Sequence, residues 1–119
     1  MARVAALIPD LLFGSKAQGV LAQGGHEVTL AGSPSAATDA LGAADVVLVD
    51  LVSAGDEGIA WLEERCARGE LGGVRALATY SHVDVEMRRR AIDAGFAAVV
   101  PRSRLMREGG HLLAELVQA

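Results

Sequence analysis

Short apolar runs of strand length alternate with longer segments of helical periodicity five times along this chain. The predicted strands are residues 3–8, 27–31, 45–49, 73–78 and 97–100. The predicted helices are residues 11–24, 34–41, 56–68, 83–94 and 105–117, with a glycine pair at 109–110 delaying the start of the last helix. Strands that alternate with helices form parallel sheets covered on both faces, so the pattern predicts an α/β fold. Right-handed crossovers then leave few topologies.

Local signals support these bounds. Ser33 is a typical helix N-cap, with Pro34 at the first helical position. The pair Gly24-Gly25 ends the first helix in the manner of a C-cap. Residues 45–49 (DVVLV) are β-branched and almost wholly apolar, which predicts a strand buried on both faces of the sheet.

Length and composition exclude whole classes of protein. The 119 residues predict one domain, residues 1–119, and 3% aromatic residues predict a core of Ala, Val, Leu and Ile. One cysteine excludes a disulfide framework, and one cysteine with three scattered histidines argues against a zinc cage. A net charge of −4 gives no support to nucleic-acid binding. Apolar runs fall well short of the roughly 20 residues that span a bilayer, so we expect a cytoplasmic protein without a membrane partner.

Polar side chains follow four of the predicted strands directly. In a doubly wound sheet, ligands bind beyond the carboxyl ends of the strands. The residues found there are Asp10, Asp50, Thr79, Tyr80, Ser81 and Arg102, and His82 is the only histidine near them. We therefore expect two carboxylates, hydroxyls and a guanidinium to converge on one small cleft. That set suits a hard divalent cation and a phosphoryl oxyanion.

Asp50 is the most informative residue of this set, because it closes a run of four apolar residues. Its backbone is then anchored, and we expect its carboxylate to open toward solvent. A carboxylate can attack a phosphoryl donor and become an acyl phosphate. Mg²⁺ would offset the repulsion between the two anions, with Asp10 as the second carboxylate. In the alternative interpretation, Asp50 only caps the loop before the third helix.

Two segments resemble the receiver domains of two-component response regulators. In residues 44–64 (ADVVLVDLVSAGDEGIAWLEE), Asp50 ends the third strand and Gly58 follows eight residues later, as in that family. Residues 81–102 (SHVDVEMRRRAIDAGFAAVVPR) resemble the family's fourth helix and fifth strand, and Arg102 stands where a lysine is usual. The resemblance covers essentially the whole chain. It implies a flavodoxin-like, five-stranded parallel sheet with strand order 2-1-3-4-5.

The resemblance also implies a function, which is signalling rather than enzymatic. Asp50 would accept a phosphoryl group in a phosphorelay, and Mg²⁺ would be held by Asp10, Asp50 and the backbone carbonyl of Val52. The new phosphoryl group would be contacted by Arg102 and by one hydroxyl from residues 79–81.

The implied partners are a histidine kinase or phosphotransfer protein and a downstream protein, with a homodimer as a further option. The downstream partner would bind the surface formed by the fourth helix, the fifth strand and the fifth helix. Nucleic acid is not among the expected partners.

The sequence departs from the family pattern at several site positions. Pro9 precedes Asp10, so one acid of the usual adjacent pair is missing. Arg102 replaces a lysine, and a planar guanidinium is not equivalent to an ammonium point charge. Spacing from Gly95 points to Tyr80 as the switch hydroxyl, with a hydroxyl on either side of it. A second reading is therefore a non-phosphorylated pseudo-receiver that acts as a protein-binding or dimerisation module.

A third reading is a small-molecule or flavin binder on the same fold. The segment after the first strand is not rich in Gly, Ser or Thr, which argues against the phosphate loop that such a binder needs.

Three further features have both structural and functional readings. Trp61 is either an exposed docking residue or lies over neighbouring aliphatic side chains. Cys66 continues the apolar stripe of its helix and is predicted to fill the core. The run Arg88-Arg89-Arg90 is either a solvated face, with Glu86 as the i,i+4 partner of Arg90, or part of a docking surface.

Overall fold

Five parallel strands form one sheet in the order β2-β1-β3-β4-β5, and the computed structural model describes residues 1–118. The strands are β1 (Arg3–Leu7), β2 (Glu27–Ala31), β3 (Val46–Asp50), β4 (Arg75–Tyr80) and β5 (Ala98–Pro101). The helices are α1 (Leu11–Gln23), α2 (Pro34–Leu41), α3 (Leu51–Ala67), α4 (Val85–Ala94) and α5 (Arg102–Gln118). The predicted fold class and strand order are confirmed.

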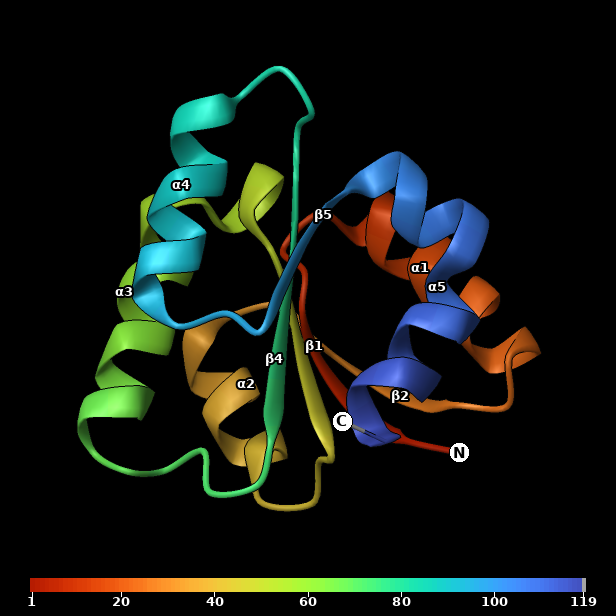
Figure 1. Cartoon of the computed structure of the whole chain (residues 1–119). Helices are drawn as coiled ribbons and strands as arrows, with labels where there is room; N and C mark the ends of the chain where they lie inside the picture. Colours follow the sequence, from red (N-terminus) through yellow and green to blue (C-terminus); the bar gives the residue numbers. More distant parts are fainter. Residues whose placement is uncertain (119) are drawn as a thin grey trace.

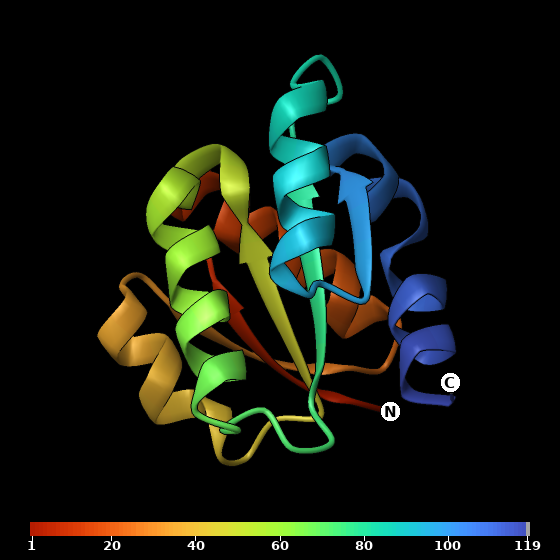
Figure 2. The same ribbon diagram turned by 60° about the vertical axis from the view of Figure 1, so that its left-hand side comes forward.

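Helices cover both faces of the sheet (Figure 1). α1 and α5 lie on one face, and α2, α3 and α4 lie on the other, an arrangement that Figure 2 shows from a second side. The middle strand β3 is buried along its whole length: Val47 and Val49 pack on the α3 side, and Val46 and Leu48 pack on the α1 side. This burial confirms the prediction of a strand buried on both faces. Each fully buried aliphatic side chain contributes roughly 1.5–3 kcal/mol to the stability of the fold.

The starts of α2 and α4 are each capped by the side chain of the residue that precedes the helix. Ser33 accepts the amide of Ala36 at the start of α2, so the predicted N-cap is confirmed. Asp84 caps α4 by accepting the amide of Met87, which places the helix start two residues later than predicted. At the other end of α4, Gly95 adopts a φ of 114°, a left-handed conformation that favours glycine.

α3 and β4 differ from their predicted bounds. α3 begins at Leu51 and not at residue 56. Asp50 caps an additional first turn, in a segment that was predicted to be a loop. That turn breaks at Gly55, where φ is 57°. β4 runs from Arg75 to Tyr80, about two residues later than predicted, so Thr79 and Tyr80 lie in the strand and not beyond it.

The predicted delay at the start of α5 is wrong, since the helix begins at Arg102 and passes through both glycines. The glycine pair at 109–110 instead allows α5 to pack closely against α1. A Cβ on Gly24 would lie 2.9 Å from the Cα of Gly110, and one on Gly109 would lie 3.0 Å from Leu21. Buried His26 fixes the same junction, because its Nδ1 accepts the amide of Ala2 and its Nε2 lies 3.1 Å from the carbonyl oxygen of Gly110.

Trp61 is buried, with 5% of its surface exposed, which decides against a docking role. Its indole Nε1 donates to Thr38 Oγ1 at 2.9 Å, and Arg65 donates to the same oxygen at 2.8 Å, which ties α3 to α2. Cys66 is exposed, so the prediction that it fills the core is wrong. The apolar stripe of α3 turns toward solvent in its last turn. Among residues 1–118, no helix combines the length and the apolar character needed to cross a membrane.

Candidate functional site

Asp50 ends β3 and also caps α3, so its backbone is fixed from both sides. It pairs in register with Thr79 of β4. The side chain has no exposed surface. The expectation that this carboxylate opens toward solvent is therefore wrong, because neighbouring side chains cover it. The capping role considered in the sequence is real, but it accounts for only part of the contacts of Asp50.

The carboxylate of Asp50 accepts hydrogen bonds on both oxygens. Oδ1 accepts the hydroxyl of Thr79 at 2.9 Å and Nε of Arg102 at 3.0 Å. Oδ2 accepts the hydroxyl of Ser53 at 2.6 Å, the amide of Ser53 at 3.2 Å, and Nη2 of Arg102. The guanidinium thus binds both oxygens, in the bidentate geometry that arginine favours with carboxylates.

Asp10 lies at the same edge of the sheet, as the N-cap of α1. Its Oδ1 accepts the amides of Leu12 and Phe13 at 3.1 and 3.2 Å, and its Oδ2 accepts Nη2 of Arg102 at 3.3 Å. The hydrogen bond from the Phe13 amide, together with Arg102, holds the pKa of the Asp10 carboxyl below its ordinary value. The structure therefore brings Asp10, Asp50 and Arg102 together as the sequence predicts.

Arg102 occupies the centre of this group, at the first position of α5. Its guanidinium carbon lies 4.0 Å from the centroid of the Phe13 ring, a cation–π contact with α1. Hydrogen bonding to Asp50, and to a lesser extent to Asp10, raises the pKa of Arg102 above its already high ordinary value. The side chain is 27% exposed, so it forms the solvent-facing cover of Asp50.

The three candidate hydroxyls occupy different places. Thr79 is fully buried and is the one that contacts Asp50. Tyr80 and Ser81 instead line a cavity of about 310 Å³ next to Arg102, together with His82 and Val52. This cavity lies at the carboxyl ends of β4 and β5. It supplies open space beside the covered carboxylate.

Comparison with known proteins gives matches in structure only. No protein-family model matches the chain, and no curated protein matches it in sequence. A response regulator from Thermotoga maritima superimposes with a TM-score of 0.82 at 16% identity, over 98% of both chains. The receiver domain of the Francisella response regulator 1452 gives 0.83 at 13% identity, over 99% of this chain and 98% of that chain. The DrrB receiver domain in a BeF3-activated form gives 0.81 at 15% identity, over 100% of this chain and 99% of that chain.

The chain has the fold of a response-regulator receiver domain. The resemblance stated from the sequence is thereby confirmed for the fold, over nearly the whole length. One glycine of the resemblance has a direct physical reason in this receiver fold. A Cβ on Gly58 would lie 2.9 Å from Cγ1 of Val49, so the position eight residues after Asp50 lets α3 approach β3 closely.

Two residues that contact Asp50 or Arg102 in this site were not predicted from the sequence. Ser53 gives Asp50 two hydrogen bonds, and its position three residues after a capping aspartate is a signal that could have found it. Phe13 stacks on Arg102, and only its scarcity as one of two phenylalanines marks it in the sequence. Neither residue carries chemistry itself, but both position groups that do.

The groups expected to hold Mg²⁺ do not fit that ion as they are arranged. Within residues 1–118, no three His, Cys, Asp or Glu side chains are grouped to hold a metal. All four carboxylate oxygens of Asp10 and Asp50 already accept hydrogen bonds, and the Arg102 guanidinium lies between the two groups. Val52 borders the cavity, and its side chain is exposed. These residues, as arranged, therefore offer no site for Mg²⁺.

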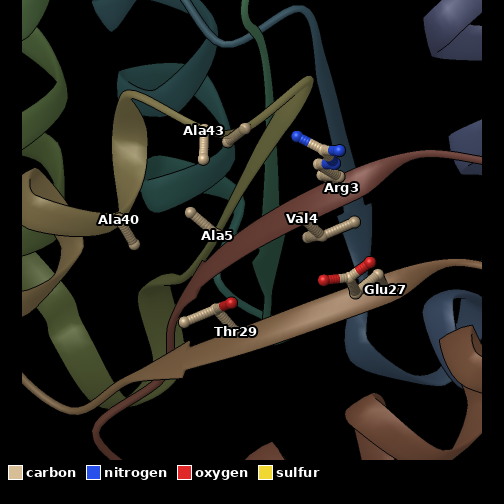
Figure 3. A pocket seen from close by; sticks show the side chains of 8 residues that line it. Arg3, Val4, Ala5, Glu27, Thr29, Ala40 and Ala43 are labelled. Carbon is tan, nitrogen blue, oxygen red and sulfur yellow. The ribbon is translucent and has the colours of Figure 1, made fainter.

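A second hollow lies at the opposite ends of the strands (Figure 3). It has a volume of about 60 Å³ and lies between the starts of β1 and β2 and the end of α2. Three alanines around the end of α2, with Ala5 of β1, leave the gap, and Arg3 and Glu27 stand at its edge. Since alanines make up half of its lining residues and the volume is small, this hollow is a packing gap and not a site of chemistry.

In the arginine band of α4, the run Arg88-Arg89-Arg90, two arginines form surface ion pairs. Arg89 pairs with Glu86 and lies 3.6 Å from Asp93, and Arg90 binds Asp56 at 2.7 Å. The predicted pairing of Arg90 with Glu86 is thus replaced by a pair that joins α4 to α3. Such exposed pairs contribute about 0–1 kcal/mol each, so the band remains available to a partner.

Proposed function

We propose that the chain is a receiver-type signalling domain in which Asp50 accepts a phosphoryl group. The donor would be a histidine kinase, a phosphotransfer protein or a small phosphodonor. The observation that carries the proposal is the convergence of Arg102 and Thr79 on the carboxylate of Asp50. A guanidinium and a hydroxyl are donors that stabilise a phosphoryl dianion. The likeness in fold to response-regulator receiver domains supports the same function.

In the proposed reaction, one carboxylate oxygen of Asp50 attacks the phosphorus of the donor. The bond between phosphorus and the leaving group breaks, the leaving group takes the electron pair, and an acyl phosphate remains on Asp50. The carboxylate must first be uncovered, because it has no exposed surface. Arg102 borders the cavity of about 310 Å³, so its guanidinium can swing into that space and admit the donor.

After the transfer, the phosphoryl oxygens would accept hydrogen bonds from Arg102 and from Thr79. Arg102 begins α5 and Thr79 lies in β4, so both contacts pull on elements next to β5. New contacts made in only one of two states shift the population toward that state. The surface of α4, β5 and α5, with exposed Ile92 on α4, would then be read by a downstream protein or by a second copy of the chain.

The proposal is tested by incubating the chain with acetyl phosphate and Mg²⁺ and measuring its intact mass. We expect one added phosphoryl group on the unmodified chain and none on Asp50→Asn. Asp93→Asn is the matched control, because Asp93 is an exposed aspartate on α4. It should gain the group like the unmodified chain. A phosphoryl group found on Asp50→Asn would show that another residue is the acceptor and would contradict the proposal.

A second candidate function is a protein-binding module that is never phosphorylated. The observation that favours it is the complete burial of Asp50, with hydrogen bonds on both of its oxygens. In this interpretation the ion pair between Asp50 and Arg102 is permanent, and its role is to stabilise the fold. Absence of any adduct with acetyl phosphate and with phosphoramidate, from a folded chain, would favour this module over the acceptor.

A further inference from the structure

The guanidinium of Arg102 is held on three sides by three groups, one from the end of β3 and two from the start of α1. Asp50 at the end of β3 receives two of its hydrogen bonds, and Asp10 at the start of α1 receives a third at 3.3 Å. The ring of Phe13 lies 4.0 Å from the guanidinium carbon. Two carboxylates and an aromatic face form a site built for a cation. The chain supplies that cation itself.

The oxygens that a divalent ion would need are already committed. Oδ1 of Asp10 accepts two backbone amides at the start of α1, and Oδ2 of Asp50 accepts both the amide and the hydroxyl of Ser53. Mg²⁺ demands near-octahedral oxygen ligands at about 2.0–2.1 Å and gives up its water reluctantly. It would have to displace the guanidinium and several of these hydrogen bonds to bind.

Charge acts in the same direction. Two carboxylates and one guanidinium leave this group with a single net negative charge, which attracts a divalent ion less than two bare carboxylates do. A divalent ion a few ångströms from the guanidinium is also repelled by the guanidinium's positive charge, and this repulsion is stronger at a protein surface than in bulk water. An arginine side chain stays protonated up to strongly alkaline pH, so this repulsion persists throughout the neutral pH range.

We propose that Arg102 is a resident cation that takes the place of a divalent metal between Asp10 and Asp50, so that this site works without Mg²⁺. The inference concerns the same site as the proposed function and rests on it for its signalling meaning. The departures from the receiver pattern then share one cause. A site with one acid fewer and an arginine for a lysine needs no metal, because the forked guanidinium bridges both carboxylates.

The direct test is a titration with Mn²⁺ alone, followed by paramagnetic broadening of backbone amide signals in NMR. We expect no selective broadening at residues 10–13 and 50–54 in the unmodified chain at millimolar Mn²⁺. In Arg102→Met the two carboxylates lose their cation, and we expect Mn²⁺ to bind there at least about tenfold more tightly. Arg104→Met is the matched control, since Arg104 lies in the same helix and pairs with Glu108 instead.

Selective broadening in the unmodified chain, with an affinity within about threefold of that of Arg102→Met, would overturn the inference. If Arg102→Met does not fold, Arg102→Lys keeps one charge without the fork and should bind Mn²⁺ with intermediate affinity. If neither variant folds, selective broadening at residues 10–13 and 50–54 of the unmodified chain at millimolar Mn²⁺ overturns the inference by itself, and its absence supports it.

The labelling experiment separates this inference from the proposed function. An adduct that forms equally with Mg²⁺ and with EDTA supports both. An adduct that forms only with Mg²⁺ supports the acceptor role and overturns the resident cation. If no adduct forms under either condition, the acceptor role fails, and the Mn²⁺ titration still decides whether Arg102 excludes the metal.

Discussion

The guanidinium of Arg102 binds both oxygens of the Asp50 carboxylate, 52 positions away in the chain. This pair joins the end of β3 to the first residue of α5. Asp50 is fully buried, whereas the Arg102 side chain keeps 27% of its surface in solvent. The pair therefore has two consequences: it neutralises a charge that has no access to water, and it forms the cover through which any phosphodonor must pass.

Removal of Arg102 should destabilise the fold, because it leaves a buried carboxylate without a counter-charge. Breaking a buried pair in this way typically costs about 3–5 kcal/mol. We expect Arg102→Met to lie near the lower end, because hydrogen bonds from Thr79 and Ser53 remain on Asp50. Urea denaturation followed by circular dichroism measures the free energy of unfolding. Arg104→Met, which removes only an exposed pair, should change it by less than about 1 kcal/mol.

Neutralising Asp50 at the same time should recover part of this loss. In Asp50→Asn/Arg102→Met no buried charge is left unpaired, so the double variant should be less destabilised than the sum of the single variants. Contacting residues show couplings of about 0.5–3 kcal/mol in such a cycle. Strict additivity of the two free energies would mean that the pair does not act as the structure indicates.

Thr79→Val tests whether the buried hydroxyl supports the carboxylate. The substitution keeps the shape of the side chain but removes the donor to Oδ1 of Asp50. Because hydrogen bonds to charged groups contribute about 1.5–3 kcal/mol, we expect a loss of that size in the free energy of unfolding. Thr29→Val, on exposed β2, should stay within about 0.5 kcal/mol of the unmodified chain. Equal effects at the two positions would contradict the proposed contact.

The alternation of apolar runs with helical segments was enough to predict a parallel sheet with helices on both faces, because parallel strands need crossover connections. The strand order came from the resemblance to receiver domains and not from the alternation. The convergence of Asp10, Asp50 and Arg102 followed from the rule that ligand sites lie beyond the carboxyl ends of the strands. These predictions depend on the chain's period and not on fine geometry.

What the sequence could not give was the burial of the site. Whether Asp50 faces water depends on the rotamer of Arg102 and on the stacking of Phe13, which are tertiary facts. The first residue of β4 could not be predicted either, because glycines in the loop before it allow the strand to begin at more than one residue. That two-residue shift decides which hydroxyl touches Asp50, and it places Thr79 there.

Two glycines, Gly19 within α1 and Gly24 at the C-cap of α1, provide predictions of opposite sign. A Cβ on Gly19 meets nothing within 4 Å, so Gly19→Ala should stabilise the fold by about 1 kcal/mol through helix propensity alone. A Cβ on Gly24 would lie 2.9 Å from the backbone of Gly110 in α5, and backbone cannot move aside cheaply. Gly24→Ala should therefore cost about 1–3 kcal/mol. Thermal and urea unfolding would both show the difference, and a shared sign would contradict the close approach of α1 and α5.

The pKa of Asp10 predicts how stability depends on acid. Hydrogen bonds from the Phe13 amide and from Arg102 lower this pKa below 3.8 in the folded chain. The folded state therefore holds fewer protons on Asp10 than the unfolded state does, and the contribution of this carboxylate is fully present above the unfolded value. It must decline as the pH falls through about 4 toward the lower, folded pKa.

Asp10→Asn isolates this contribution, because asparagine still caps a helix but carries no charge for Arg102. We expect the unmodified chain to be more stable than Asp10→Asn at pH 7, and the gap to close as the pH falls below about 4. Urea denaturation of both proteins over a pH series measures the gap directly. A gap that stayed constant into acid would show that the carboxylate contributes no more to the folded chain than a neutral cap, and that Arg102 is held by Asp50 and Phe13 alone.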